Sequence, residues 1–422
     1  MSSLQVIPEG YKQTEVGIIP EDWDVKIFGQ VMNIRHGKDQ KSVQVTDGLY
    51  PIFGTGGQMG TTNTPLYDKP SVLIGRKGTI NKPRFMDTPF WTVDTLFYSE
   101  VSSKDSAKFI YYKFCMIDWM QYNEASGVPS LNASTIESVF NSFPKLEEQT
   151  VIANALSDVD ALLAELEKLI AKKQAIKTAT MQQLLIGKTR LPQFATYTDG
   201  EKQGQTKGTK PSELGEIPED WDVARMGDIS NVNQGLQIEI EQRKSYQSEI
   251  SKPYITIQSL KLTEPTEFID EYSSAVCCVE DEILMTRTGN TGIVVTGVTG
   301  VFHNNFFKIV YQKSKLNKDF FVCFLRSSDS KKRILDKAGT STIPDLNHND
   351  FYSLPIILPS KNEQTAIATI LSDMDEEIQA LKQRLSKTRQ IKQGMMQELL
   401  TGKTRLPFEK TNMKSQGEPH AD

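Results

Sequence analysis

The stretch that decides the fold is Glu148 to Pro192, EQTVIANALSDVDALLAELEKLIAKKQAIKTATMQQLLIGKTRLP. It returns 215 positions later as Glu363 to Pro407, EQTAIATILSDMDEEIQALKQRLSKTRQIKQGMMQELLTGKTRLP, with 23 of 45 positions identical. A second repeat, EVGIIPEDWDV at 15–25, returns 198 positions later as ELGEIPEDWDV at 213–223. Because stacking repeats run only about 20–50 residues, these long periods predict two similar modules in tandem, each a globular part followed by a long helix.

Apolar residues in both copies of the long stretch recur at alternating spacings of four and three, the pattern of a coiled-coil seam. The seam positions are Ile152, Leu156, Val159, Leu163, Leu166 and Ile170, then Ile367, Leu371, Met374, Ile378, Leu381 and Leu385. Gly187 and Gly402 are expected to end the helices. Since a lone helix would leave this stripe in water, we expect the two helices to pack on each other. The alternative is that each helix folds back on its own globular part.

The globular parts have short apolar runs separated by turn signals, which predicts mixed α+β domains. Expected strands include 43–45, 50–53, 71–74, 95–98, 282–285 and 306–311, and expected helices lie at 104–122 and 319–337. The predicted domains are 1–146 and 211–361 for the globular parts, 147–192 and 362–407 for the helices, 193–210 for a flexible polar linker, and 408–422 for a disordered tail.

Composition narrows the class of protein. The chain has 422 residues and a formal net charge of −5, which argues against a protein that holds nucleic acid without help from partners. No apolar run approaches the roughly 20 residues that span a bilayer, and no secretory signal is visible at the start. The four cysteines have no metal-ligand spacing. We therefore expect a protein of the reducing cytoplasm.

Motifs for catalysis and cofactor binding fail on their context. The glycine-rich segment 54–60 is not followed by a helix, as a dinucleotide loop would be. Gly-Lys-Thr at 187–189 and 402–404 ends a predicted helix, whereas a phosphate loop begins one. No Ser/His/Asp set, His-Glu-x-x-His or Asn-Pro-Pro-aromatic sequence is present. We expect no catalytic residue, metal site or cofactor site in this chain.

Polar residues in the loops where the copies differ are the candidates for a binding site. They are Gly56, Gly57, Gln58, Arg76, Lys77, Lys82 and Arg84 in the first copy, and Arg243, Lys244, Arg287, Thr288 and Asn290 in the second. Arg and Lys suit guanine edges or phosphates, and Asn suits adenine edges. Such loops can also be simply solvated, but Arg76 and Arg287 follow a strand at the same place in both copies. Trp23 and Trp221 are expected in the core.

The order of motifs resembles the specificity (S) subunit of type I restriction-modification systems. Each copy begins with Leu-Gly-x-Ile-Pro-x-x-Trp, complete at 214–221 and with Val16 in place of Leu in the first copy. A Pro-x-Leu-Asn turn follows at 129–132 and 344–347, and then Glu-Gln-x-x-Ile-Ala at 148–153 and 363–368. The resemblance covers about Tyr11 to Pro407, and the specific signal is the order of the motifs, given twice.

The resemblance implies a non-catalytic DNA reader in which each globular part is a target-recognition domain for one half of a split, asymmetric site. It also implies that the helices form an antiparallel coiled coil with pseudo-twofold symmetry, which sets the spacer and docks two adenine-N6 methyltransferase (M) subunits. S-adenosylmethionine would belong to those M subunits, and ATP and Mg to two possible motor-nuclease (R) subunits. Two alternatives stay open: an assembly scaffold that binds no DNA, and the specificity part of a fused, type IIB-like restriction–methylation enzyme.

Overall fold

The computed structural model describes residues 7–265, 267–339 and 343–407, so the predicted tail at 408–422 lies outside the described residues. The chain divides into two compact units. The first contains the chain up to Glu167 together with the chain from Gln383 onward, and the second is Lys168–Lys382. Both long helices are therefore divided between the units. Below, the first lobe is residues 7–145 and the second lobe is 209–360.

The first lobe is built on two four-stranded sheets, ordered β4-β11-β8-β9 and β10-β6-β7-β5. The strands of these sheets are β4 (Met32–Arg35), β5 (Gln44–Val45), β6 (Tyr50–Gly54), β7 (Gly57–Thr62), β8 (Ser71–Gly75), β9 (Arg84–Met86), β10 (Trp91–Thr92) and β11 (Leu96–Val101). The remaining elements are β1 (Tyr11–Thr14), β2 (Gly17–Pro20), β3 (Asp24–Ile27), η1 (Phe28–Gln30), α1 (Ala107–Met116), η2 (Trp119–Tyr122), α2 (Ala133–Ser138) and β12 (Phe140–Phe143).

The second lobe keeps one of these sheets and changes the other. The sheet β16-β23-β20-β21 matches β4-β11-β8-β9 in order. In the other sheets β22-β17-β18 corresponds to β10-β6-β7, with one parallel and one antiparallel pair, but the fourth strand differs: β5 pairs with β7, whereas β19 pairs with β22. The strands are β16 (Ser230–Gln234), β17 (Lys252–Ile255), β18 (Phe268–Ile269), β19 (Cys277–Cys278), β20 (Ile283–Thr286), β21 (Val294–Val295), β22 (Gly300–Phe302) and β23 (Phe306–Tyr311). The other elements are β13 (Thr209–Ser212), β14 (Gly215–Pro218), β15 (Asp222–Arg225), α5 (Met226–Ile229), η3 (Ile240–Gln242), η4 (Ser259–Lys261), η5 (Ser274–Val276), α6 (Lys318–Arg326), α7 (Ser328–Ala338), α8 (His348–Ser353) and β24 (Pro355–Leu358).

Both helices predicted in the lobes are divided in the structure, 104–122 into α1 and η2, and 319–337 into α6 and α7. Ser327 separates α6 from α7, because its hydroxyl donates to the Phe324 carbonyl and accepts from the Ser330 amide. The first bond caps the end of α6 and the second caps the start of α7, so the side chain gives both helix ends a partner for an orphan backbone group. The prediction of a single helix was therefore wrong at this residue.

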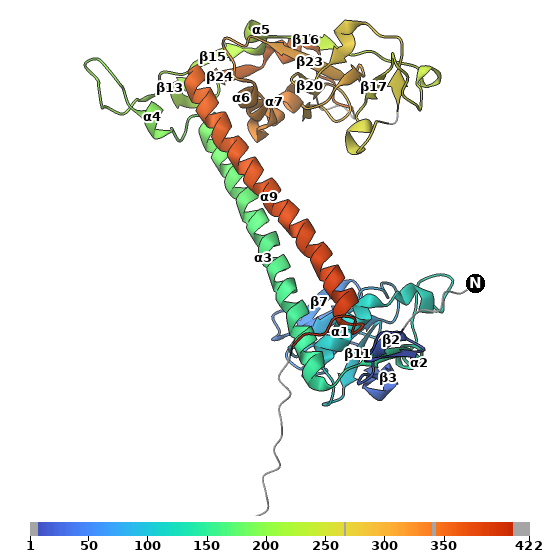
Figure 1. The fold of residues 1–422 in the computed structure, drawn as a ribbon. Helices are drawn as coiled ribbons and strands as arrows, with labels where there is room; N and C mark the ends of the chain where they lie inside the picture. The colour runs from blue at the N-terminus through green and yellow to red at the C-terminus, as the bar shows by residue number, and fades with distance from the viewer. Residues whose placement is uncertain (1–6, 266, 340–342, 408–422) are drawn as a thin grey trace, which may run out of the picture. The chain divides into compact units, whose positions relative to one another are not determined.

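The long helices are α3 (Leu146–Leu185) and α9 (Lys361–Leu399), and they run antiparallel (Figure 1). Within the first unit Lys392 pairs with Asp160, and Arg389 pairs with Glu167 further along α3. Within the second unit Lys173 pairs with Glu377, and Lys177 further along α3 pairs with Asp375. In each unit the residue numbers of α9 decrease as those of their partners in α3 increase, so the helices are antiparallel.

All twelve predicted seam residues are buried or half-buried, but they do not all face the partner helix. The first two of each helix, Ile152 and Leu156 in α3 and Ile367 and Leu371 in α9, belong to the core of the lobe that precedes that helix. The far end of the other helix completes each core, with Leu399 in the first unit and Leu184 in the second. Each helix thus packs on its own lobe at its beginning and against the other helix further along.

The predicted linker at 193–210 contains more structure than its composition indicates. Its first residues belong to a short helix, α4 (Pro192–Ala195), and Thr196 then forms a bridge with Thr206. The hydroxyl of Tyr197 donates to the Glu219 carboxylate, and the Gly208 amide donates to the same oxygen at 2.8 Å. The segment therefore makes specific contacts with the beginning of the second lobe.

Candidate nucleic-acid interface

Arg76 and Arg287 directly follow the matching strands β8 and β20. In both lobes the arginine carbonyl accepts a backbone hydrogen bond from the leucine of the Pro-x-Leu-Asn turn. Leu131 donates to Arg76 at 2.9 Å, and Leu346 donates to Arg287 at 2.8 Å. Each lobe therefore joins the loop at its strand end to that turn, and the two arginines occupy equivalent positions. Their contact with DNA remains a prediction.

Both guanidinium groups already have acidic partners within their own lobe. Arg76 Nη1 donates to Asp94 at 2.5 Å. Arg287 Nη2 donates to Asp345 at 2.8 Å, and its guanidinium lies 5.4 Å from the centre of the Phe307 ring. A guanine or phosphate would have to share or displace these carboxylates, because each arginine is already paired with an acid.

The other candidates of the first lobe surround a β-hairpin. Gly56 lies in the turn between β6 and β7, and Gly57 begins β7 with φ +133°, a conformation that favours glycine. Arg84 Nη2 donates to the carbonyl of Thr55 in this turn at 3.3 Å. The structure thus brings Arg84 to the glycine-rich turn, which connects two strands of one sheet.

Three further candidates of the first lobe, Gln58, Lys77 and Lys82, are exposed. The backbone of Lys77 forms a bridge with Ser130 in the Pro-x-Leu-Asn turn. Lys77 therefore lies beside the same turn that binds Arg76.

In the second lobe, Arg243 and Lys244 are held by neighbouring acids. The Arg243 guanidinium donates to the Ile238 carbonyl at 2.9 Å and to Glu267 at 3.3 Å. Lys244 is paired with Asp270, and this hydrogen bond raises the pKa of the lysine above its ordinary value. Both residues therefore stabilise the loop that carries them.

A pocket of about 370 Å³ lies beside the strand-end loop of the second lobe. It is lined by Arg243, residues 256–258, Gly289, Asn290, His303 and Asn305. The predicted candidates Arg243 and Asn290 thus meet here, while Thr288 pairs by its backbone with Asp345. Sequence reasoning missed Gln258 and His303, because neither belongs to a repeated motif.

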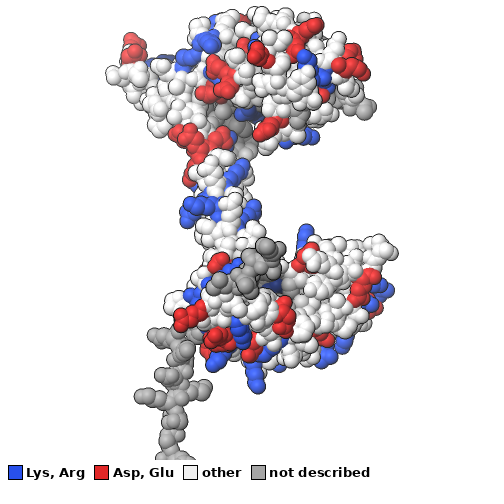
Figure 2. Space-filling view, turned by 45° about the vertical axis from the view of Figure 1, so that its right-hand side comes forward, with Lys and Arg blue, Asp and Glu red and all other residues white. Residues whose placement is uncertain are grey.

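Charge is mixed over the visible surface. Figure 2 shows basic and acidic side chains interspersed on both units, with no single continuous basic field on that face. Among the described residues no group of three or more His, Cys, Asp or Glu could hold a metal ion. None of the helices in the described ranges is long and apolar enough to cross a membrane.

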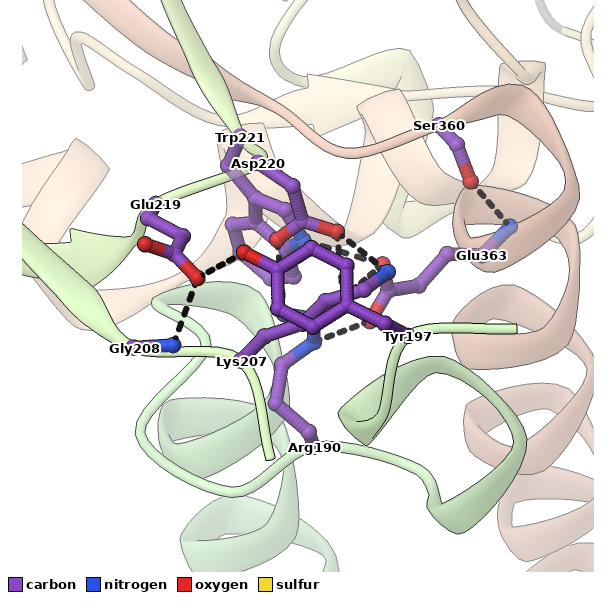
Figure 3. Close-up of polar contacts among 9 residues, drawn as sticks. All are labelled: Arg190, Tyr197, Lys207, Gly208, Glu219, Asp220, Trp221, Ser360 and Glu363. Carbon is purple, nitrogen blue, oxygen red and sulfur yellow. Dashed lines mark hydrogen bonds and ion pairs between the residues drawn. The ribbon is translucent and has the colours of Figure 1, made fainter. Parts of the chain in front are cut away.

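The repeated motifs that surround each lobe meet in a buried ionic cluster. In the second unit Arg190, which follows α3, donates to Glu363 at 2.6 Å and to Asp220 at 2.8 Å (Figure 3). The Trp221 indole donates to Glu363 at 2.9 Å, and the Glu363 side chain is only 2% exposed. The cluster therefore ties the end of α3 and the start of α9 to the beginning of the second lobe.

The first unit contains the same cluster made from the opposite helix ends. Arg405, after α9, donates to Glu148 at 2.6 Å and to Asp22 at 2.7 Å. The Trp23 indole donates to Glu148 at 3.2 Å. Trp23 and Trp221 are 1% and 0% exposed, which confirms their predicted place in the core.

Glycine makes these clusters possible at the helix ends. Gly187 and Gly402 have φ values of +70° and +73°, as expected for the residue that ends a helix. A Cβ atom on Gly187 would lie 2.4 Å from the Pro218 ring, and one on Gly402 would lie 2.5 Å from Pro20. The repeated Gly-Lys-Thr-Arg-Leu-Pro is therefore a helix stop that packs on the repeated Ile-Pro-Glu-Asp-Trp, a contact that no periodic pattern predicts.

Comparison with known proteins gives a consistent result. Residues 20–178 and 218–390 each match the family described as "Type I restriction modification DNA specificity domain". The chain is 23% identical to the type I restriction enzyme MjaVIII specificity subunit of Methanocaldococcus jannaschii, over 94% of this chain and 96% of that protein. It is 24% identical to the putative MjaX specificity subunit of the same organism, over 94% and 97%.

Solved structures show the same fold. The S subunit of a type I restriction-modification system from M. genitalium superimposes with a TM-score of 0.58 at 18% identity, over 90% of this chain and 96% of that one. A chain from a structure of type I R-M complex assembly gives a TM-score of 0.53 at 12% identity, over 92% and 99%.

Proposed function

Because the chain belongs to the family of type I restriction-modification DNA specificity proteins, we propose that it is the DNA-recognition subunit of such a system. Each lobe would bind one half of a bipartite, asymmetric site, and α3 with α9 would set the spacer between the halves. The observation that carries the proposal is the duplication of one frame with two different outer parts. The sheets β4-β11-β8-β9 and β16-β23-β20-β21 agree in order, while the second sheets and their loops differ.

This combination suits a reader of two unlike sequences. The frame fixes where each strand-end arginine lies, and the variable loops decide which base edges a lobe can contact. Two linked lobes also bind more tightly than either alone, because the second contact becomes intramolecular. The mixed charge of the loops indicates that phosphate contacts come largely from elsewhere.

Partner subunits would supply those contacts and the chemistry. We propose two methyltransferase (M) subunits that carry S-adenosylmethionine, and two motor-nuclease (R) subunits that use ATP and Mg, all in the cytoplasm. This chain would bind no cofactor. Support for a docked partner comes from α3, where Leu169 and Ile176, seven positions apart, are 37% and 41% exposed. Apolar side chains at this spacing suit a further helix packed alongside.

The test is to express this chain with its methyltransferase in a host that lacks both and to sequence N6-methyladenine in the genomic DNA. The expected motif has two short defined halves separated by an undefined spacer, and it disappears when this chain is omitted. A continuous motif, or methylation that persists without the chain, would contradict the proposal.

A further inference from the structure

Three side-chain amides meet at the pocket of the second lobe. Gln258 follows β17, Asn290 follows β20, and Asn305 lies between β22 and β23, so three separate segments contribute. Gln258 and Asn290 are exposed, and Asn305 is half-buried. Within the described ranges, no hydrogen bond to another residue engages any of these three amide groups. Their donors and acceptors are therefore available to a ligand.

The charge of the pocket indicates what kind of ligand it suits. Its one guanidinium, Arg243, is paired with Glu267 and with the Ile238 carbonyl, so the pair carries no net charge. Burial lowers the pKa of His303, which favours a neutral imidazole. Its Nδ1 accepts from the backbone N–H of Asn305 at 3.0 Å, so Nε2 carries the hydrogen. An uncharged polar lining suits the edge of a base better than a phosphate, whose negative charge favours unpaired cations.

The first lobe lacks this set of amides. The correspondence between the lobes follows from matching backbone bonds: Arg76 donates to the Thr95 carbonyl at 2.8 Å, and Arg287 donates to the Asn305 carbonyl at 2.7 Å. By the same alignment of strands, the positions of Gln258, Asn290 and Asn305 are occupied in the first lobe by Gly56, Thr79 and Thr95. The amides are thus a feature of one reading surface and not of the shared frame.

We propose that Gln258, Asn290 and Asn305 form an adenine-reading site in the second lobe. An amide presents a donor and an acceptor side by side, which match N7 and the N6 amino group of adenine in the major groove. Guanine offers two acceptors at the same edge and would leave the amide oxygen opposed by O6. The inference rests on the proposed function, and it adds that the half-site bound by the second lobe contains an A·T pair facing this pocket.

The test compares three variants in the full complex with its methyltransferase: Asn290→Ala, Asn305→Ala and, as a matched control, Asn231→Ala. Asn231 is an exposed amide on β16 of the same lobe, away from the residues that line the pocket. The motif is obtained by sequencing N6-methyladenine, and melting temperatures confirm that each variant folds. We expect preference at one or two A·T positions of a single half-site to fall by about tenfold in each pocket variant. The other half-site, and the whole motif of Asn231→Ala, should not change.

The possible results separate the two proposals. If wild-type protein directs no bipartite methylation, the proposed function itself fails. If wild type gives a bipartite motif that Asn290→Ala and Asn305→Ala leave intact, the adenine site is wrong while the function stands. A uniform loss of methylation with an unchanged motif would indicate a backbone contact, and relaxation at a G·C position would show that the amides read another base. Either result would overturn the inference.

Discussion

The first lobe has a buried lysine, Lys113, at the position where the second lobe has a buried phenylalanine, Phe324. Lys113 and Phe324 lie seven positions after the residues that cap α1 and α6, Ser106 and Asn317. The buried Lys113 ammonium donates to the carbonyl of Leu400, at the end of α9, at 2.5 Å. The buried Phe324 ring instead lines a small pocket together with side chains at the end of α3. The equivalent helix ends of the two units thus contact a polar group in one lobe and an apolar group in the other.

The ionic clusters do not vary in this way. Both lobes use the same four residue types, with Arg, Asp, Glu and Trp in the same pattern of bonds. A buried carboxylate requires an ionic partner and satisfied oxygens, so no single member can change by itself. Apolar contacts tolerate exchange of shape and volume more easily. This difference explains why the repeats are strongest at the ends of each lobe.

Loss of a cluster arginine should have the largest effect on stability. Arg190→Ala leaves Glu363 buried without its cation, so we expect the free energy of unfolding to fall by about 3–5 kcal/mol. Arg405→Ala should lower the free energy of unfolding by less, because the Arg405 side chain is 33% exposed whereas the Arg190 side chain is 10% exposed. Chemical denaturation measures both. The control is Arg389→Ala, whose partner Glu167 is more than half exposed, with an expected cost of about 0–1 kcal/mol. Equal losses for Arg190→Ala and Arg389→Ala would refute the role given to the cluster.

Replacement of a helix-ending glycine should have the next largest effect. In Gly187→Ala the alanine must keep a positive φ, and its Cβ must displace the Pro218 ring. We therefore expect the free energy of unfolding to fall by about 1–3 kcal/mol. Gly394→Ala is the matched control, because Gly394 lies inside α9 with open space around its Cα. Alanine there should raise the free energy of unfolding by about 0.5–1 kcal/mol. Thermal melts of both variants should therefore shift in opposite directions, and a shift in the same direction would argue against the packing described.

The third effect, which is small near pH 7 and grows as the pH rises, concerns the difference between Lys113 and Phe324. Burial lowers the pKa of Lys113 to about 7, while the pKa of a lysine in the unfolded chain is about 10.4. Between pH 7 and 10 the unfolded chain binds a proton that the folded chain lacks, so this group makes folding more favourable as the pH rises. Relative to Lys113→Met, the wild-type free energy of unfolding should increase by about 1 kcal/mol per pH unit over that range. Parallel pH profiles for the two proteins would show that Lys113 does not titrate there.

The sequence predicted the frame well, because the frame depends on periodic patterns. Helices expected from the repeated heptads correspond to α3 and α9, and the expected strand at 306–311 is β23. The strand-end arginines were placed correctly because their strands have a clear apolar pattern. These features are local, so a single segment is enough to reveal them.

Long-range pairs could not be found in this way. Arg190 lies 173 positions from Glu363, and Arg405 lies 383 positions from Asp22, so no periodicity connects them. The side-chain amides of the pocket come from segments that are not repeated in the sequence, and no motif next to Gln258 indicates a binding role. The acids that pair with Arg243 and Lys244 were missed for the same reason. Arg243 and Lys244, like Arg76 and Arg287, therefore have acidic partners inside their own lobe.

We propose that one duplicated frame carries two independent readers of DNA. A lobe exchange tests this: the first lobe, between the cluster residue Trp23 and the start of α3, is replaced by the same part of a family member with a different target. N6-methyladenine sequencing of DNA from cells that contain the chimera and the methyltransferase gives the new motif. We predict that one half of the motif changes while the other half and the spacer length stay the same. A motif that changes in both halves, or in neither, would contradict the account.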